Sequence, residues 1–172
     1  HDQADCLVTG EQIKKAIQNM AVAISNEIST EMPIVVCVLN GGLIPMAQLL
    51  LHLQFPLETD YLHATRYGKQ TLGTHLSWQA RPTHELTNRT ILVVDDIFDE
   101  GYTLEAICNY LQDLNTKKVY SAALLNKLHD RKVAYRPDFI GINVEDRFLY
   151  GFGMDYQGYF RNVDGIYAVK DL

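Results

Sequence analysis

The sequence predicts an α/β fold, a mainly parallel twisted sheet flanked by helices. Residues 34–39 (IVVCVL) and 90–95 (TILVVD) have the continuous hydrophobicity of strands that are buried on both faces. Each run is followed by a glycine-containing turn and then by apolar residues at helical spacing. Strands that alternate with helices in this way usually pair in parallel, with helices on both faces of the sheet.

The first elements follow from caps and periodicity. A helix is expected over about 11–29, with Thr9 as its N-cap and isoleucines forming an apolar stripe. Pro33 ends this helix before the strand 34–39. The turn 40–42 (NGG) then leads into a second helix over 43–53, which carries a proline in its first turn.

The remaining elements complete the alternation. Residues 57–66 are strand-like, whereas 67–89 are polar and predict a long connection. The strand 90–95 precedes another helix, marked by Leu104, Ile107, Leu111 and Leu114, and two further strands are expected at 119–127 and 138–144. Ligands of such folds bind beyond the carboxyl ends of the strands, so the turns after 34–39, 90–95 and 119–127 are predicted to share one rim.

The bulk composition is that of one globular domain. The chain has 172 residues, of which 47% are hydrophobic and 21% charged, and it is long enough to bury a sizeable core. A single domain over 1–172 is therefore expected. The net charge of −6 argues against bulk nucleic-acid or anionic-membrane binding. It leaves room for a small nucleotide, whose phosphates need only a local site.

The cysteines and the absence of targeting features indicate a cytoplasmic protein. Cys6, Cys37 and Cys108 are widely spaced and form no C-x-x-C pair, which favours reduced thiols. No apolar run approaches the roughly 18 residues of a membrane span, and the first residues lack the layout of a signal peptide.

The junction after the strand 90–95 combines a phosphate cradle with acids. Gly101 allows the backbone to approach a ligand closely, and Thr103 is expected to cap the following helix. Free N–H groups and the helix dipole would favour an anion there, yet Asp95, Asp96 and Asp99 lie in the same stretch. The alternative interpretation is a plain strand-to-helix connection with solvated acids.

The acids limit what the ligand can be. One carboxylate beside a phosphate is repulsive by roughly a kcal/mol at short range. Three are tolerated only with a compensating cation, or where they face another part of the ligand. A phosphorylated sugar with a second anionic group bridged by Mg²⁺ meets both conditions, and carboxylates could stabilise a sugar cation in the transition state.

Residues 93–103 (VVDDIFDEGYT) resemble the signature of the type I phosphoribosyltransferases. The pattern is an apolar strand, two acids, two apolar residues, Asp, any residue, Gly, any residue, Thr. The resemblance implies phosphoribosyl pyrophosphate bound with Mg²⁺, with Asp95 and Asp96 at the ribose hydroxyls. It implies that the 5′-phosphate lies on Asp99, Glu100, Gly101, Tyr102 and Thr103. Tyr102 replaces a residue that is often basic in relatives.

The C-terminal third is similar to the hypoxanthine-guanine phosphoribosyltransferases. The match includes a strand-end Lys in LLNK (124–127), PDFIG (137–141), GFGMDY (151–156) and YFR (159–161). The resemblance implies that the purine site contains Lys127 at the exocyclic oxygen, Phe148 stacked on the ring, Leu149 contacting it through its backbone, and Asp155. Without the resemblance, Lys127 would be interpreted as a surface residue and Phe148 as a core residue.

The resemblance also implies residues around the pyrophosphate and the metal. Gly41 and Gly42 would present backbone N–H groups after a cis peptide bond at Leu39–Asn40, where relatives often have Lys instead of Asn40. Arg161, Tyr67 and Arg66 would contact the pyrophosphate. The Mg²⁺ ligands would be Asp95, Asp96 and Asp155. A mobile loop is expected at about 66–80, and a small hood over the base site from segments near 1–10 and 138–172.

The function implied by the resemblance is purine salvage by a homodimer or homotetramer. The enzyme would transfer the phosphoribosyl group to hypoxanthine or guanine, giving IMP or GMP, with Asp99 as the general base. One alternative is an RNA-binding pyrimidine regulator on the same fold, which would need a basic face that the charge does not favour. Another is a transferase for xanthine or a different base, although Lys127 disfavours adenine. The last is a phosphate-binding α/β domain without chemistry.

Overall fold

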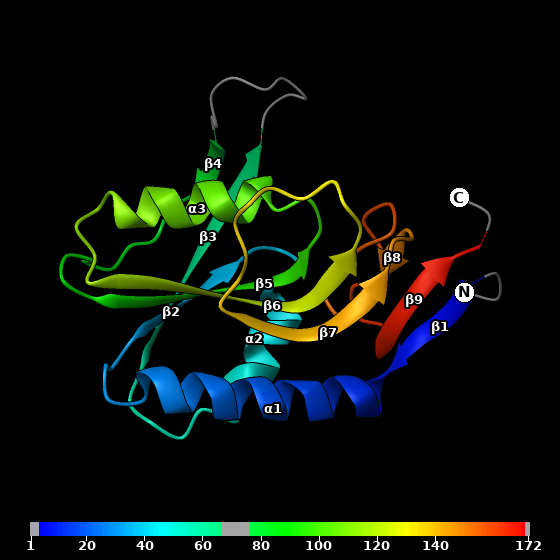
Figure 1. The fold of residues 1–172 in the computed structure, drawn as a ribbon, viewed down its shortest axis with the longest axis horizontal. Coiled ribbons are helices and arrows are strands. Elements are labelled where there is room, and N and C mark those ends of the chain that lie inside the picture. The colour runs from blue at the N-terminus through cyan, green and yellow to red at the C-terminus, as the bar shows by residue number, and fades with distance from the viewer. Residues whose placement is uncertain (1–3, 67–75, 171–172) are drawn as a thin grey trace.

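The larger of two sheets forms the centre of the molecule in a computed structural model that describes residues 4–66 and 76–170 (Figure 1). Its six strands have the order β4-β3-β2-β5-β6-β7. Five of them pair in parallel, and β4 pairs antiparallel with β3 at one edge. Their bounds are β2 Ile34–Val38, β3 Glu58–Arg66, β4 Leu76–Ala80, β5 Thr90–Phe98, β6 Lys118–Leu128 and β7 Phe139–Glu145. The predicted fold class is confirmed.

Helices cover both faces of this sheet. α1 (Gly10–Ile28) and α2 (Leu43–Leu50) lie on one face, and α3 (Tyr102–Gln112) lies on the other (Figure 1). The side chains of β5 alternate between the two layers. Leu92 and Val94 are buried with α1 and α2, whereas Ile91 and Val93 are buried with α3. A strand buried on both sides needs apolar residues at every position, which explains the uninterrupted hydrophobic run.

The start of α1 is closed by the predicted cap. The Oγ1 of Thr9 accepts a hydrogen bond from the N–H of Gln12 at 3.3 Å, and the Oε1 of Gln12 accepts one from the N–H of Thr9 at 2.9 Å. This reciprocal pair is a capping box. The apolar stripe of α1 is buried as expected, with Ile13, Ile24 and Ile28 fully inaccessible.

A second, three-stranded sheet has the order β1-β9-β8 and is antiparallel. Its strands are β1 Ala4–Thr9, β8 Leu149–Tyr150 and β9 Gly165–Val169. It stands beyond the carboxyl ends of β6 and β7 (Figure 1). Sequence analysis missed all three strands. They come from the two segments in which a hood was expected, and whether they cover a base stays a prediction.

Three elements differ from the predicted ones by three residues or more. The connection 67–89 contains β4, because Leu76–Ala80 pairs with β3. β5 continues through the acids to Phe98, because its pairing with β6 extends that far. The helix predicted over 43–53 ends at Leu50.

Asp60 of β3 fixes the segment after β4, since it accepts hydrogen bonds from the N–H groups of Thr83 and His84 and contacts Nδ1 of His84.

The cysteines form no disulfide; Cys37 and Cys108 are buried, and Cys6 is exposed. Across residues 4–66 and 76–170, no helix combines the length and apolarity that crossing a membrane requires.

Candidate active site

The rim predicted from the sequence exists. β2, β5 and β6 are parallel neighbours, so their carboxyl ends meet at one edge of the sheet (Figure 1). These ends carry the turn 40–42, the segment 95–103 and Lys127. One edge therefore carries three of the predicted groups of residues, although they are far apart in the sequence.

The turn between β2 and α2 has glycines at positions 41 and 42 because neither position has room for a side chain. A Cβ on Gly41 would overlap the carboxylate of Asp96, and one on Gly42 would lie 2.7 Å from the carbonyl oxygens of Val38 and Val94. The Leu39–Asn40 peptide bond is cis, as the resemblance implied. The backbone of the turn thus lies directly beside the acidic pair.

Asp95 and Asp96 form a half-buried acidic pair near the end of β5. Oδ1 of Asp95 accepts a hydrogen bond from the N–H of Asp96 at 2.9 Å, and Oδ1 of Asp96 accepts one from the N–H of Ile97 at 2.7 Å. Burial raises the pKa of Asp95 well above its usual value, and the charge of Asp96 raises it further. Burial also raises the pKa of Asp96. Hydroxyl donors or a cation would relieve this cost, which suits a sugar phosphate that carries Mg²⁺.

The segment after β5 encloses a cavity of about 230 Å³, which is lined by Asp95 and residues 97–104. Gly101 has a φ of 95° and is the N-cap of α3, and a Cβ there would overlap the ring of Phe98. Thr103 was expected to be the cap, and this prediction is wrong, because α3 already begins at Tyr102 and Thr103 lies in its first turn. Gly101 has no side chain, so no side-chain hydrogen bond caps α3 at this residue. Tyr102, Thr103 and Leu104 of the first turn line the cavity, and the start of a helix is an arrangement that binds anions.

Asp99 pairs with two side chains from the end of β6. Its Oδ2 accepts a hydrogen bond from Nζ of Lys127 at 3.0 Å, and its Oδ1 lies 2.6 Å from Nε2 of His129. Burial raises the pKa of Asp99, but the hydrogen bonds from His129 and Lys127 outweigh burial and hold the pKa below its usual value. The side chain of Lys127 is only 13% exposed, so it is not a solvated surface lysine.

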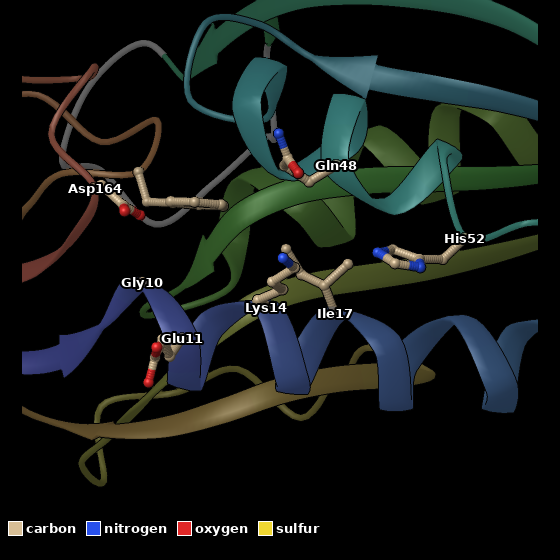
Figure 2. A pocket seen from close by; sticks show the side chains of 8 residues that line it. Gly10, Glu11, Lys14, Ile17, Gln48, His52 and Asp164 are labelled. Atoms are coloured by element: carbon tan, nitrogen blue, oxygen red, sulfur yellow. The ribbon is translucent and has the colours of Figure 1, made fainter.

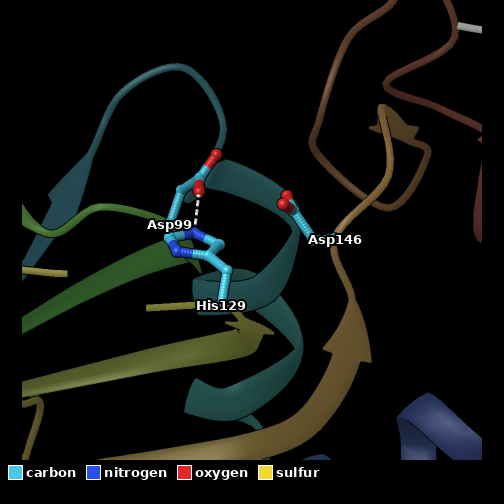
Figure 3. Close-up of side chains that lie close together, drawn as sticks. All are labelled: Asp99, His129 and Asp146. Carbon is cyan, nitrogen blue, oxygen red and sulfur yellow. Dashed lines mark hydrogen bonds and ion pairs between the residues drawn. The ribbon is translucent and has the colours of Figure 1, made fainter. Parts of the chain in front are cut away.

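Asp146, just after β7, extends this network. Its Oδ1 lies 3.7 Å from Nζ of Lys127, and its Oδ2 accepts a hydrogen bond from Arg131 at 2.9 Å. Figure 3 shows Asp99, His129 and Asp146 gathered around one point. Their ligand atoms lie within 4.8 Å of one another, and no other such group of three occurs in the part of the chain that the structure describes. The ammonium of Lys127 and the guanidinium of Arg131 already balance the two carboxylates, which disfavours a metal ion there.

The C-terminal segment reaches the same rim through Gly153. A Cβ on Gly153 would overlap the carbonyl oxygen of Gly41. Arg161 donates a hydrogen bond to the carbonyl oxygen of Gly153 at 2.6 Å, and its Nη2 lies 2.9 Å from Oδ1 of Asp155. Asp155 is therefore paired with Arg161. The described chain does not assemble Asp95, Asp96 and Asp155 into a three-ligand group, so a Mg²⁺ on Asp95 and Asp96 would need further ligands from the substrate.

The predicted purine-contacting residues divide by exposure. Phe148 is 49% exposed and makes an edge-to-face contact with Tyr156 at a centroid distance of 5.7 Å. It is not the core residue that composition alone would suggest. Leu149 is buried in β8, which agrees with a role for its backbone only. Arg66 ends β3, and the last part of the loop expected at about 66–80 forms β4. Tyr67 and the rest of that loop, residues 67–75, lie outside the described residues.

Sequence reasoning missed His129, Arg131 and Asp146. One signal was present, because His129 lies two residues after Lys127 and alternate residues of an extended chain point to the same side. The functional meaning of that spacing depends on how β6 pairs with β5. Lys132 was also missed; its Nζ donates hydrogen bonds to the carbonyl oxygens of Phe98 and Asp99 at 3.0 and 2.5 Å.

A separate cavity of about 430 Å³ lies between α1, α2 and the turn before β9 (Figure 2). Lys14 and His52 line it together with Gln48 and Asp164. None of the residues predicted for the site lines this cavity, so the rim remains the candidate active site.

Comparison with known proteins shows which family the chain resembles. Residues 3–157 match the family described as phosphoribosyl transferase domain. The hypoxanthine-guanine phosphoribosyltransferase of Aquifex aeolicus is 33% identical over 168 residues, which cover 96% of this chain and 94% of the relative. The enzyme of the same name from Bacillus subtilis is 30% identical over 174 residues, which cover 99% of this chain and 95% of the relative.

The fold is also similar to that of solved structures. A structure titled hypoxanthine-guanine-xanthine phosphoribosyltransferase superposes with a TM-score of 0.90 at 28% identity. The superposition covers 99% of this chain and 100% of the other.

Proposed function

The chain belongs to the phosphoribosyl transferase family, and from this premise we propose that it is a purine salvage enzyme. It transfers the phosphoribosyl group of phosphoribosyl pyrophosphate to hypoxanthine or guanine and releases IMP or GMP with pyrophosphate. The observation that carries the proposal is the 3.0 Å contact between Nζ of Lys127 and Oδ2 of Asp99 on the rim. It joins the two side chains assigned to reading the base and accepting its proton.

Lys127 selects the base in this proposal. Its ammonium donates a hydrogen bond to the exocyclic oxygen of a 6-oxopurine, whereas the amino group of adenine would present a donor to a donor. A buried polar group left unpaired in this way discriminates strongly. The half-exposed ring of Phe148 stacks on the purine, and Asp155 and the backbone of Leu149 complete the contact.

The sugar donor occupies the rest of the rim. Asp95 and Asp96 accept hydrogen bonds from the ribose hydroxyls, and the turn from Asp99 to Thr103 holds the 5′-phosphate with its backbone N–H groups. Gly41, Gly42 and Arg161 contact the pyrophosphate. Arg66 and Tyr67 belong to the same proposal. Mg²⁺, bound with the pyrophosphate and the aspartates, would neutralise the leaving group.

The chemistry needs one proton acceptor. The bond between C1′ of the ribose and the pyrophosphate oxygen breaks, and its electron pair leaves with the pyrophosphate. N9 of the purine supplies the electron pair of the new bond to C1′. The proton on N7 passes to Oδ2 of Asp99, which lies at the rim in its deprotonated form because its pKa is lowered.

The proposal extends to assembly and location. A homodimer or homotetramer is supported by an apolar cavity of about 570 Å³ beside α2 and β3, where Leu43 and Tyr61 are 58% and 49% exposed. Light scattering of the purified chain would measure this state. We also propose a cytoplasmic location, supported by the widely spaced cysteines, and no nucleic-acid partner, supported by the net charge of −6.

A purine panel tests the proposal. The chain is incubated with Mg²⁺, phosphoribosyl pyrophosphate and one of hypoxanthine, guanine, xanthine or adenine, and pyrophosphate release is measured. Hypoxanthine or guanine should react at least about 100-fold faster than adenine. A preference for xanthine would select that alternative, and no release with any oxopurine would contradict the proposal. Filter binding of RNA over a salt series tests the regulator.

Two variants test the assigned roles. Lys127→Met should lose most of the discrimination against adenine, whereas Lys118→Met at the opposite end of β6 should keep it. Asp99→Asn should lower kcat by about 100-fold with little change in KM for the sugar donor. Asp113→Asn, at the far end of α3, is the matched control. Unchanged turnover of Asp99→Asn would remove Asp99 as the base.

A further inference from the structure

We propose that His129 is a positioning residue that holds the carboxylate of Asp99 ready for the purine proton while Lys127 engages the base. This inference rests on the proposed function, because it assigns a partner to the base of that reaction. It concerns a residue that no motif in the sequence marked.

The two oxygens of Asp99 have different partners. Oδ2 accepts the hydrogen bond from Lys127, and Oδ1 contacts Nε2 of His129 at 2.6 Å. Figure 3 shows the imidazole of His129 edge-on to the carboxylate. Both partners come from the end of β6, two residues apart, so they approach from the same side.

The tautomer of His129 is set by a backbone group. Its Nδ1 accepts a hydrogen bond from the N–H of Arg131 at 3.1 Å. A neutral imidazole whose Nδ1 accepts must carry its proton on Nε2, and Nε2 therefore donates to Asp99. The side chain of His129 is only 5% exposed, so the ring is held in place by burial as well.

The two partners differ in what they can do next. Lys127 has a long flexible stem, and its ammonium already lies near a second carboxylate, Asp146, at 3.7 Å. It can turn to the base oxygen and leave Asp99. His129 is fixed between Asp99 and the N–H of Arg131 and cannot follow. It therefore keeps Oδ1 bonded, which leaves Oδ2 directed at the rim where the base binds.

The surrounding charges nearly balance, so the hydrogen bond from His129 matters. Burial raises the pKa of Asp99, and the bonds from His129 and Lys127 lower it. Once Lys127 turns away, the hydrogen bond from His129 is the main contribution that still lowers the pKa of Asp99 against the effect of burial. The charged groups facing this pair are Lys127 of β6, Arg131 and Lys132 of the following segment, Glu100 of the turn after β5, and Asp146 after β7.

Two amide variants separate the contacts of His129. His129→Gln can place its NH₂ near the position of Nε2 and keep the bond to Asp99. His129→Asn is shorter, so it keeps only a partner for the N–H of Arg131. We expect the pKa of Asp99, measured by ¹³C carboxyl NMR on the ligand-free protein, to rise by about one unit in His129→Asn and to stay at its wild-type value in His129→Gln.

Kinetics tests the same pair during turnover. The acidic limb of the pH profile of kcat should move up by about one pH unit in His129→Asn, and His129→Gln should restore it. KM for the sugar donor should stay within about twofold in both variants, because neither contact reaches the donor. In an Asp99→Asn background, the His129→Asn change should have no further effect on kcat.

Several results would overturn the inference. One is an unmoved limb and Asp99 pKa in His129→Asn; another is a His129→Gln variant that behaves like His129→Asn. If His129→Asn fails to fold, the wild-type tautomer decides, since a proton on Nδ1 in ¹⁵N NMR contradicts the geometry. A wild type that turns over no oxopurine refutes the proposed function and the inference with it. Normal turnover with an unmoved limb refutes the inference alone.

Discussion

Gly153 lies against the backbone carbonyl of Gly41, so closely that a Cβ on Gly153 would overlap that oxygen. The contact joins the turn after β2, assigned to the pyrophosphate, to the segment that carries Asp155 and Arg161. Arg161 reinforces it by donating a hydrogen bond to the carbonyl oxygen of Gly153 at 2.6 Å. Two parts of the rim that are more than a hundred residues apart in the sequence are therefore held in register by one glycine.

Gly153→Ala should separate these two parts. The residue has a φ of 106°, which costs an alanine about 1 kcal/mol, and the overlap with Gly41 adds to this cost. We expect the free energy of unfolding to fall by at least about 2 kcal/mol and KM for the sugar donor to rise. Urea unfolding and pyrophosphate-release kinetics measure the two effects.

Gly158→Ala is the matched control for this prediction. Gly158 also has a positive φ, 86°, but nothing lies within 4 Å of a Cβ placed there. It should lose only about 1 kcal/mol and keep its KM. Equal losses in both variants would mean that backbone strain alone, and not the contact with Gly41, explains Gly153.

Phe148→Leu should weaken purine binding without unfolding the protein. The ring is 49% exposed and contacts Tyr156 through its edge, so its truncation removes little buried area. Base–aromatic stacking contributes about 1–3 kcal/mol, which predicts a KM for the base about 5-fold or more higher at an unchanged melting temperature. Tyr159→Leu, an exposed aromatic residue on the same segment, should change neither quantity. A normal KM for the base in Phe148→Leu would place the purine elsewhere.

Asp60→Asn should destabilise the fold in a pH-dependent way. Burial raises the pKa of Asp60, but hydrogen bonds from His84, Tyr61 and Thr83 outweigh it and lower the pKa overall. A carboxyl with a lowered pKa stabilises the folded chain above the unfolded pKa of about 3.9. This stabilisation is lost as the pH falls through the lower, folded value. The variant should lose about 2 kcal/mol at pH 7 and progressively less below pH 4.

Unfolding of Asp60→Asn and wild type by urea over this pH range checks the prediction. The exposed Asp113→Asn variant should match the wild type throughout. A destabilisation of Asp60→Asn that does not change between pH 7 and pH 3 would show that shape, and not the charge, is what the site requires.

The burial of each strand explains which strands the sequence could predict and which it could not. β2 and β5 are buried on both faces, so every position records its environment and the strands were predictable. β4 lies at a sheet edge and is half-buried. β8 has only two residues, and these pair with the later strand β9. Their identity as strands depends on pairing with distant residues, which no local pattern records.

The site divides in the same way. Asp95, Asp96 and Asp99 lie in one contiguous motif and could be identified from it. His129 has meaning only because the register of β5 and β6 places Phe98 opposite Asn126, which brings the residues that follow each strand together. Register is set by the whole sheet, so the partner of Asp99 became visible only in the folded chain.

Asp95→Asn should stabilise the protein and impair it at the same time. Burial and the charge of Asp96 raise the pKa of Asp95. A carboxyl with a raised pKa binds its proton more tightly in the folded chain, so it costs stability once the pH exceeds the unfolded value of about 3.9. The variant should therefore gain about 1–2 kcal/mol at pH 7, and the gain should vanish below pH 4.

Bound sugar donor should make the wild type more stable than Asp95→Asn. With Mg²⁺ and phosphoribosyl pyrophosphate, the wild type should gain melting temperature because the ribose hydroxyls and the cation satisfy the acidic pair, whereas Asp95→Asn should gain little. Its KM for the donor should rise about 10-fold or more, as loss of a charged hydrogen bond predicts. Asp60→Asn is the contrasting variant in the same assay, because its free energy of unfolding at pH 7 should fall and not rise. If Asp95→Asn is less stable than the wild type without ligand, the prediction is contradicted. The acidic pair would then stabilise the fold, and it would not cost stability in order to bind the donor.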